Sequence, residues 1–231
     1  MSWQPFVDGV RQGIQLIISR DPEVIQITLR SLETAGAATA MAALVGLPIG
    51  IVLGLGSFRG RGFLKTLFGA LVGIPTVSLG LILLVLFSRS GPIGYLDLLY
   101  TVPGIAVGEA VLVIPLIVSF VASAVEAKDI GVRDLTRTLG ASEFEASMAI
   151  VREAWSGVSL AIVSSFNRAF AELGIAMMIG ANIAGLTRLL TTAIALQSNM
   201  GDFGLAFALS FILFAVVISL NFVISWLGRE R

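Results

Sequence analysis

Five long apolar runs constrain the fold of this chain more than any other feature of its sequence. They cover residues 34–58, 66–87, 103–125, 158–180 and 203–227. Because the hydrocarbon core of a bilayer is about 30 Å thick, a helix that crosses it needs about 20 residues, and each run has that length. Lipid offers no partners for backbone polar groups, so each run is expected to be helical. The sequence therefore predicts an all-α, polytopic membrane protein with about five transmembrane helices in a single domain, residues 1–231.

The composition supports this fold class and excludes several functions. Hydrophobic residues make up 56% of the chain and charged residues 13%, and the mean hydropathy of +0.96 lies outside the range of soluble domains. The formal net charge of zero gives no general attraction to nucleic acid. Cysteine and histidine are absent, so disulfides and the commonest zinc ligands are excluded. Without a convergent catalytic set or a glycine-rich phosphate loop, the chain is expected to be neither an enzyme nor an ATPase.

The N-terminal 30 residues mix apolar side chains with polar ones such as Asp8 and Arg11. They are too polar for a span or for the apolar core of a signal peptide, and we expect an amphipathic helix at the membrane interface. The stretch RDPEV at residues 20–24 is typical of a helix start, with Asp21 as the cap. Glycines spaced four residues apart in the first run predict a close contact with another helix: Gly46, Gly50 and Gly54.

A polar segment at residues 126–155, EAKDIGVRDLTRTLGASEFEASMAIVREAW, is the only extended charged stretch of the chain. Its apolar residues recur at roughly helical spacing and Gly140 interrupts them, which predicts a short, partly exposed helix pair. A membrane protein has little use for such a segment unless a soluble partner docks on it. We interpret the segment as the handle for that partner, with an ordinary solvated loop as the alternative.

Lysine and arginine residues between the runs predict the orientation in the membrane. Nine of them lie on the side of the polar segment: Arg59, Arg61, Lys65, Lys128, Arg133, Arg137, Arg152, Arg229 and Arg231. Five lie on the other side: Arg11, Arg20, Arg30, Arg89 and Arg188. This bias places the polar segment and the C-terminus in the cytoplasm, and the N-terminus outside.

The fourth run carries polar residues at a depth where lipid is expected, namely Asn167, Arg168 and Glu172. Arg168 and Glu172 are four residues apart and share a helix face. Glu109, in the third run, is a further intramembrane charge that could join their network. Charges at such depth face a bundle interior or a cavity. Two interpretations stay open, a structural ion pair and a face that lines or gates a polar path.

The chain after the fourth run offers a group of hydrogen-bond donors close to the outer surface: Asn182, Thr187, Arg188, Thr191 and Thr192. Residues 187–196 are expected to form a short helix at the membrane surface. Hydroxyl, amide and guanidinium groups at a helix start are suited to an oxyanion. A plain interfacial loop would have the same composition.

These residues resemble a known family, the membrane permease subunits of ATP-binding-cassette importers for oxyanions. DLTRTLGAS at 134–142 is similar to the cytoplasmic EAA loop of that family, although Leu135 and Thr136 stand in place of its alanines. NRAFAELGIAMMIGANIAGLTRLLTTAIAL at 167–196 resembles blocks of molybdate and tungstate permeases. RDPEV, FRGRG at 58–62, SRSGPIG at 88–94 and GDFGLAFAL at 201–209 are most similar to tungstate permeases. The resemblance runs nearly end to end.

The resemblance implies a type I importer with a MetI-like permease architecture. Two copies of this subunit would form the path, two cytoplasmic ATPase subunits would hold the ATP and magnesium, and an extracytoplasmic protein would deliver the oxyanion. Residues of the EAA-like loop would couple to the ATPase: Asp134, Leu135, Thr138, Leu139, Gly140, Ala141 and Ser142. The residues predicted for the path or its gate are Asn167, Arg168, Glu172, Asn182 and Thr187.

Several alternatives remain open at the level of the sequence. Within the importer interpretation, molybdate or sulfate could be the cargo in place of tungstate. From other classes, a self-sufficient channel or secondary transporter could use the intramembrane charges as a gate or ion relay. A membrane-embedded enzyme or assembly factor is disfavoured by the missing catalytic set.

Overall fold

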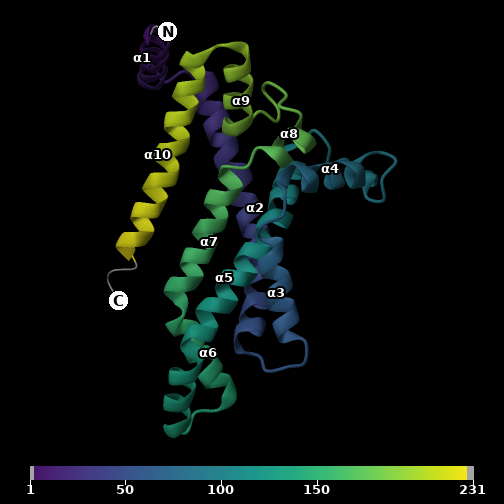
Figure 1. The fold of residues 1–231 in the computed structure, drawn as a ribbon, viewed down its shortest axis with the longest axis vertical. Coiled ribbons are helices and arrows are strands. Elements are labelled where there is room, and N and C mark those ends of the chain that lie inside the picture. The colour runs from purple at the N-terminus through teal and green to yellow at the C-terminus, as the bar shows by residue number, and fades with distance from the viewer. Residues whose placement is uncertain (1–2, 228–231) are drawn as a thin grey trace.

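The computed structural model describes residues 3–227, apart from the side chains of residues 5, 6, 129, 130, 133, 220 and 223–227, and shows only helices in that part (Figure 1). The elements are α1 (Gln4–Ile18), α2 (Pro22–Leu55), α3 (Arg61–Leu71), α4 (Thr76–Phe87), the 3-10 helix η1 (Gly94–Leu96), α5 (Val102–Thr138), α6 (Glu143–Glu153), α7 (Trp155–Phe170), α8 (Gly174–Gly180), α9 (Leu190–Met200) and α10 (Phe203–Leu227). The predicted all-α membrane fold is confirmed. Arg229 and Arg231, used to predict the orientation, lie outside the described residues.

Three of the five predicted spans are single helices. α2 and α5 each contain a membrane-spanning length of apolar helix. α10 has the bounds that the sequence predicted. α5 continues beyond its apolar part to Thr138, so the polar segment begins as the extension of a span and not as a separate helix.

The other two runs are broken, which corrects their prediction as straight spans. In run 66–87, α3 and α4 meet at an angle of 97°. Pro75, the residue before α4, has ψ 119°, an extended conformation that ends helical geometry, and it cannot donate a backbone hydrogen bond. In run 158–180, α7 ends at Phe170 and the short α8 begins at Gly174. α7 also bends by 56° from the preceding α6.

The N-terminal segment divides earlier than predicted. α1 ends at Ile18 and Arg20 has φ 56°, so only the first part of residues 1–30 is a separate helix. The predicted helix start is confirmed, because Asp21 Oδ1 accepts hydrogen bonds from the backbone of Glu23 at 2.9 Å and of Val24 at 3.1 Å. α1 packs against α10 (Figure 1).

α2 and α5 form the central packing of the fold. A Cβ placed on Gly46, Gly50 or Gly54 would lie 2.9, 2.8 and 2.7 Å from the side chains of Ile117, Val121 and Val125, respectively. These three α5 residues are fully buried and repeat at four-residue spacing, as the glycines do. The close contact that the glycines predicted is confirmed. We call this contact the glycine seam. Helices α3, α6, α7 and α8 also pack on α5.

The two ends of the molecule differ in character. α6 and the turn before it form one end, and α1, α8 and α9 lie towards the other (Figure 1). α4 projects sideways from the bundle (Figure 1). Its inner residues, including Gly80 and Leu83, are buried, and α8 packs on it. Its outer residues, including Leu81 and Ile82, are exposed.

The glycine seam predicts opposite effects for two Gly→Ala changes in α2. At Gly50 the added methyl would press on Val121, whereas at Gly36 no atom lies within 4 Å of the new Cβ. We expect Gly50→Ala to lower the stability by about 1–3 kcal/mol through overpacking. Gly36→Ala should be neutral or stabilise by up to about 1 kcal/mol through helix propensity. Thermal unfolding of the purified protein in detergent measures both, and equal effects would contradict a tight seam.

Candidate functional site

The break between α7 and α8 is organised by one carboxylate. Glu172 is 2% exposed, and its Oε2 accepts a hydrogen bond from Arg168 Nη1 at 2.9 Å. Its Oε1 accepts from the backbone N–H groups of Gly174 at 2.7 Å and Ile175 at 3.2 Å, at the start of α8. Thr191 Oγ1 donates to the backbone carbonyl of Glu172 at 2.7 Å. Glu172 is therefore both the partner of an arginine and the N-terminal cap of a helix.

A cavity of about 400 Å³ opens beside this break. Arg168, whose side chain is 40% exposed, lines it together with Glu172. The remaining lining residues come from the starts of α4 and α8 and the chain between α7 and α8: Thr76, Val77, Ala171, Leu173, Gly174, Met177 and Met178. A Cβ on Gly174 would lie 2.8 Å from Thr76 Oγ1, so the two broken runs touch at their breaks. The cavity combines one guanidinium, one carboxylate, one hydroxyl and an apolar wall.

Glu109 lies in the packed interior of α5, where it is 1% exposed. Its carboxyl group lies close enough to that of Glu172 for an electrostatic interaction between them. Its Oε2 has no hydrogen-bond partner among the described residues, and the same holds for Asn167 Oδ1. Of the three residues predicted to form a network, Arg168 and Glu172 form a hydrogen-bonded pair. Glu109 lies near this pair but is not hydrogen-bonded to it.

The loop between α8 and α9 uses most of its polar groups internally. Thr187 is fully buried, donates to the carbonyl of Gly180 at 2.5 Å and accepts from Ile183 N at 3.0 Å. Asn182 has φ 52°, and its buried Oδ1 has no partner in the described part of the chain. Arg188 Nη1 donates to Glu23 of α2 at 3.0 Å. These contacts fix the loop to α2, and among its described side chains they leave Asn182 Oδ1 and Arg188 Nε buried without a hydrogen-bond partner.

The turn between α5 and α6 has the geometry of a Schellman motif. Gly140 N donates to the carbonyl of Arg137 at 3.0 Å, and Ala141 N donates to that of Thr136 at 3.0 Å. Gly140 has φ 83°, which glycine adopts without strain. The residues predicted to couple lie together here, at the end of the molecule: Asp134, Leu135, Thr138, Leu139, Gly140, Ala141 and Ser142.

α6 begins at this turn with a capping box. Glu145 N donates to Ser142 Oγ at 3.3 Å, and Ser142 N donates to Glu145 Oε2 at 2.8 Å. The hydrogen bond from Ser142 N holds the pKa of Glu145 below its ordinary value, so the box stays ionised at neutral pH. Because its folded pKa is lowered, any stability it adds is lost as the pH falls through that value.

The same end of the molecule exposes large apolar side chains. Leu139 is 79% exposed and Phe144 74%, and Leu135 and Met148 are also exposed. A groove of about 450 Å³ runs along α6: Phe144, Glu145, Met148, Ala149, Arg152 and Glu153 line it. Sequence reasoning missed Phe144 and Met148, although their four-residue spacing places both on one helix face. Apolar groups surrounded by charges are typical of a protein-binding surface.

Three comparisons identify proteins similar to this chain. Residues 46–230 match the family described as "Binding-protein-dependent transport system inner membrane component". A tungstate uptake system permease protein of Peptoclostridium acidaminophilum is 34% identical over 223 residues, which cover 96% of this chain and 98% of that protein. Its counterpart in Campylobacter jejuni is 30% identical over 96% of this chain and 93% of that protein. A molybdenum transport system permease protein of Escherichia coli is 29% identical, over 92% of this chain and 96% of that protein.

Solved structures with the same fold include the MetNI methionine ABC transporter in an inward-facing conformation. One of its chains superimposes with a TM-score of 0.73 at 16% identity, and the match covers 90% of this chain and 95% of that chain. An amino acid ABC transporter gives a TM-score of 0.69 at 18% identity, over 93% of this chain and 97% of that chain. At these identities the likeness shows the fold alone.

The two roles of Glu172 predict an asymmetry between its variants and those of Arg168. Arg168→Gln removes one charged hydrogen bond and should lower the stability by about 1.5–3 kcal/mol. Glu172→Ala also leaves two backbone N–H groups of α8 without a partner and should cost about 3 kcal/mol or more. The swap Arg168→Glu with Glu172→Arg should not recover stability, because arginine cannot accept the α8 N–H groups. Thermal unfolding in detergent checks this order, and full recovery by the swap would contradict the capping role.

Proposed function

The chain belongs to the family of binding-protein-dependent transport system inner membrane components, and on that premise we propose that it is the permease subunit of an ATP-binding-cassette importer for tungstate. It is a multi-pass protein of the cell membrane. The observation that carries the cargo assignment is the 34% identity to a tungstate uptake permease over nearly the full length of both chains. The permease for molybdenum at 29% identity keeps molybdate as the second candidate, and a sulfate permease at 29% keeps sulfate as the third.

The coupling to ATP hydrolysis is assigned to the end of the molecule formed by the α5–α6 turn. Two cytoplasmic ATPase subunits, which hold the ATP and magnesium, would each receive this end from one copy of a permease homodimer. Leu139 and Phe144 supply exposed apolar area, and the Schellman turn at Gly140 with the Ser142 capping box keeps that area in one shape. A preformed surface loses little conformational entropy on docking.

A movement of the docked ATPase subunits would pass from this surface into the membrane through α5. This helix is continuous for 37 residues, from the turn to Val102, which corresponds to about 55 Å at 1.5 Å per residue. A Cβ on Gly108 would lie 2.6 Å from Ile179, so α5 is in close contact with α8 near its far end. Displacement of the turn would therefore move α8 and reshape the cavity beside Arg168. Alternating access needs such a connection between the two ends.

The path for the anion is assigned to the cavity at the breaks of the two runs, where the guanidinium of Arg168 supplies hydrogen-bond donors. Asn167, Glu172, Asn182 and Thr187 would act mainly by shaping this region, because the carboxylate and the threonine hydroxyl already have internal partners. An extracytoplasmic binding protein would select the anion and deliver it. The permease then needs to conduct an oxyanion without binding it tightly.

Reconstitution of the importer tests the cargo assignment. The permease is co-expressed with the ATPase and the binding protein of its importer, and placed in liposomes with tungstate, molybdate or sulfate. We expect ATP-dependent uptake of tungstate, with molybdate and sulfate as weaker competitors at equal concentration. Preferential uptake of molybdate or sulfate would overturn the cargo. Uptake by the permease alone, without ATP, would instead identify a channel or secondary transporter.

Two charge substitutions at the proposed docking surface test the coupling. Leu139→Asp and Phe144→Asp place a carboxylate in an apolar contact that excludes water, so each should reduce association with the ATPase at least tenfold. Tyr95→Asp is the matched control, because Tyr95 is equally exposed but lies in η1, outside this surface. Co-purification and anion-stimulated ATP hydrolysis measure the effect. Normal hydrolysis and uptake in both surface variants would show that the ATPase docks elsewhere.

A further inference from the structure

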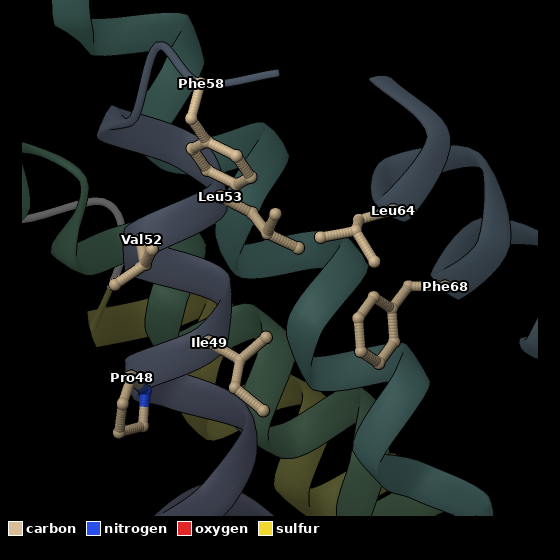
Figure 2. Close-up of a pocket in the computed structure, with 7 residues that line it drawn as sticks. All are labelled: Pro48, Ile49, Val52, Leu53, Phe58, Leu64 and Phe68. Atoms are coloured by element: carbon tan, nitrogen blue, oxygen red, sulfur yellow. The ribbon is translucent and has the colours of Figure 1, made fainter. Parts of the chain in front are cut away.

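A groove with only apolar side chains in its lining lies between α2 and α3 (Figure 2). Its volume is about 280 Å³, and it is open to the outside of the bundle. The residues that line it are Pro48, Ile49, Val52, Leu53, Phe58, Leu64 and Phe68. Figure 2 shows the α2 residues on one side and Leu64 and Phe68 of α3 on the other. Neither the proposed path nor the proposed docking surface uses these residues.

The groove follows from how the two helices pack on α5. The glycine seam draws α2 onto α5, and a Cβ on Gly54 would lie 2.7 Å from Val125. α3 reaches α5 through larger side chains, since Leu64 and Phe68 pack against the buried cluster of Leu53, Val118 and Ala122. α2 therefore lies close to α5, whereas larger side chains keep α3 farther from α5. The space between α2 and α3 stays unfilled.

The depth of the groove places it in one leaflet of the bilayer. Its innermost residue, Pro48, precedes the end of α2 at Leu55 by seven residues, or about 10 Å of helix. The groove thus extends from the loop after α2 into the hydrocarbon region. In that environment an apolar groove is covered either by lipid chains or by another protein surface.

The mouth of the groove carries positive charge. Arg59, Arg61 and Lys65 lie at or beside the loop between α2 and α3. Arg61 and Lys65 share a single carboxylate, that of Glu126, and Arg61 also donates to the carbonyl of Leu53 at 2.8 Å. Arg59 is exposed, and no ion pair joins it to another side chain that the structure describes. Three cations beside one anion leave an excess of positive charge at the membrane surface.

We propose that this groove binds an anionic phospholipid of the leaflet on the side of the docking surface. One acyl chain lies along Ile49, Leu53 and Leu64, and the phosphate lies at Arg59. Basic residues beside a transmembrane segment attract anionic headgroups. A second copy of the chain fits less well, because a two-fold contact through this groove would bring two positive mouths together. The inference does not depend on which oxyanion is transported.

Lipid binding to the purified dimer tests the headgroup contact. Native mass spectrometry of the delipidated protein in detergent, titrated with phosphatidylglycerol or with phosphatidylcholine of the same acyl chains, gives both affinities. We expect the wild type to prefer phosphatidylglycerol. Arg59→Gln should weaken phosphatidylglycerol binding about fivefold and leave phosphatidylcholine unchanged, since one surface arginine contributes about this factor. Arg89→Gln changes another exposed arginine, in the loop after α4, and should have no effect.

A second pair of variants tests the groove itself. Leu64→Trp fills the space that Leu64 lines, so it should weaken the binding of both lipids. Phe63→Trp changes the adjacent, exposed residue outside the lining and should leave both affinities unchanged. Thermal unfolding confirms that each variant is folded. Three results would overturn the proposal. The wild type could bind the two lipids with equal affinity, or Arg59→Gln could bind phosphatidylglycerol as tightly as the wild type does. The third is a dimer in which the second copy covers the groove and excludes lipid from it.

Discussion

A helix that is interrupted inside a bilayer must find partners for the backbone groups that the interruption frees, because lipid supplies none. This constraint explains the placement of the polar residues in the fourth run. Glu172 accepts the first N–H groups of α8, and Thr187 accepts an N–H of the following loop and donates to the carbonyl of Gly180. These side chains therefore stabilise the break by satisfying the backbone groups that it frees. The intramembrane charge that first suggests a path is also what allows the helix to break.

The second constraint is the continuity of α5. It carries the glycine seam with α2, the contact with α8 and the turn before α6 in a single helix. A loop at the membrane surface would have separated the turn from the membrane mechanically. In the observed fold, a movement of the turn must displace α2 and α8 or break close contacts. The seam resists sliding, because each glycine receives a β-branched side chain of α5 that has few rotamers.

The parts of the fold that sequence reasoning found are those governed by local patterns. Asp21 followed by Pro22 has the chemistry of a helix start, and Gly46, Gly50 and Gly54 have the spacing of one helix face. The breaks in the two runs were missed because hydropathy measures how apolar a segment is, and not whether it is straight. α4 and α8 are apolar as well. What redirects them is Pro75 in one case and the carboxylate of Glu172 in the other, and the effect of Glu172 depends on a fold that brings Thr191 and Thr76 beside it.

The electrostatics of the cavity suit the conduction role proposed for it better than they suit tight binding. Arg168 has five N–H donors, and one of them is bonded to Glu172. The other donors remain for an anion in the cavity, yet the adjacent carboxylate balances most of the positive charge. An oxyanion would therefore be oriented by hydrogen bonds while gaining little net Coulomb energy. A transport site must release what it binds, and a guanidinium already neutralised by a buried carboxylate meets that requirement where an unpaired one would retain the anion.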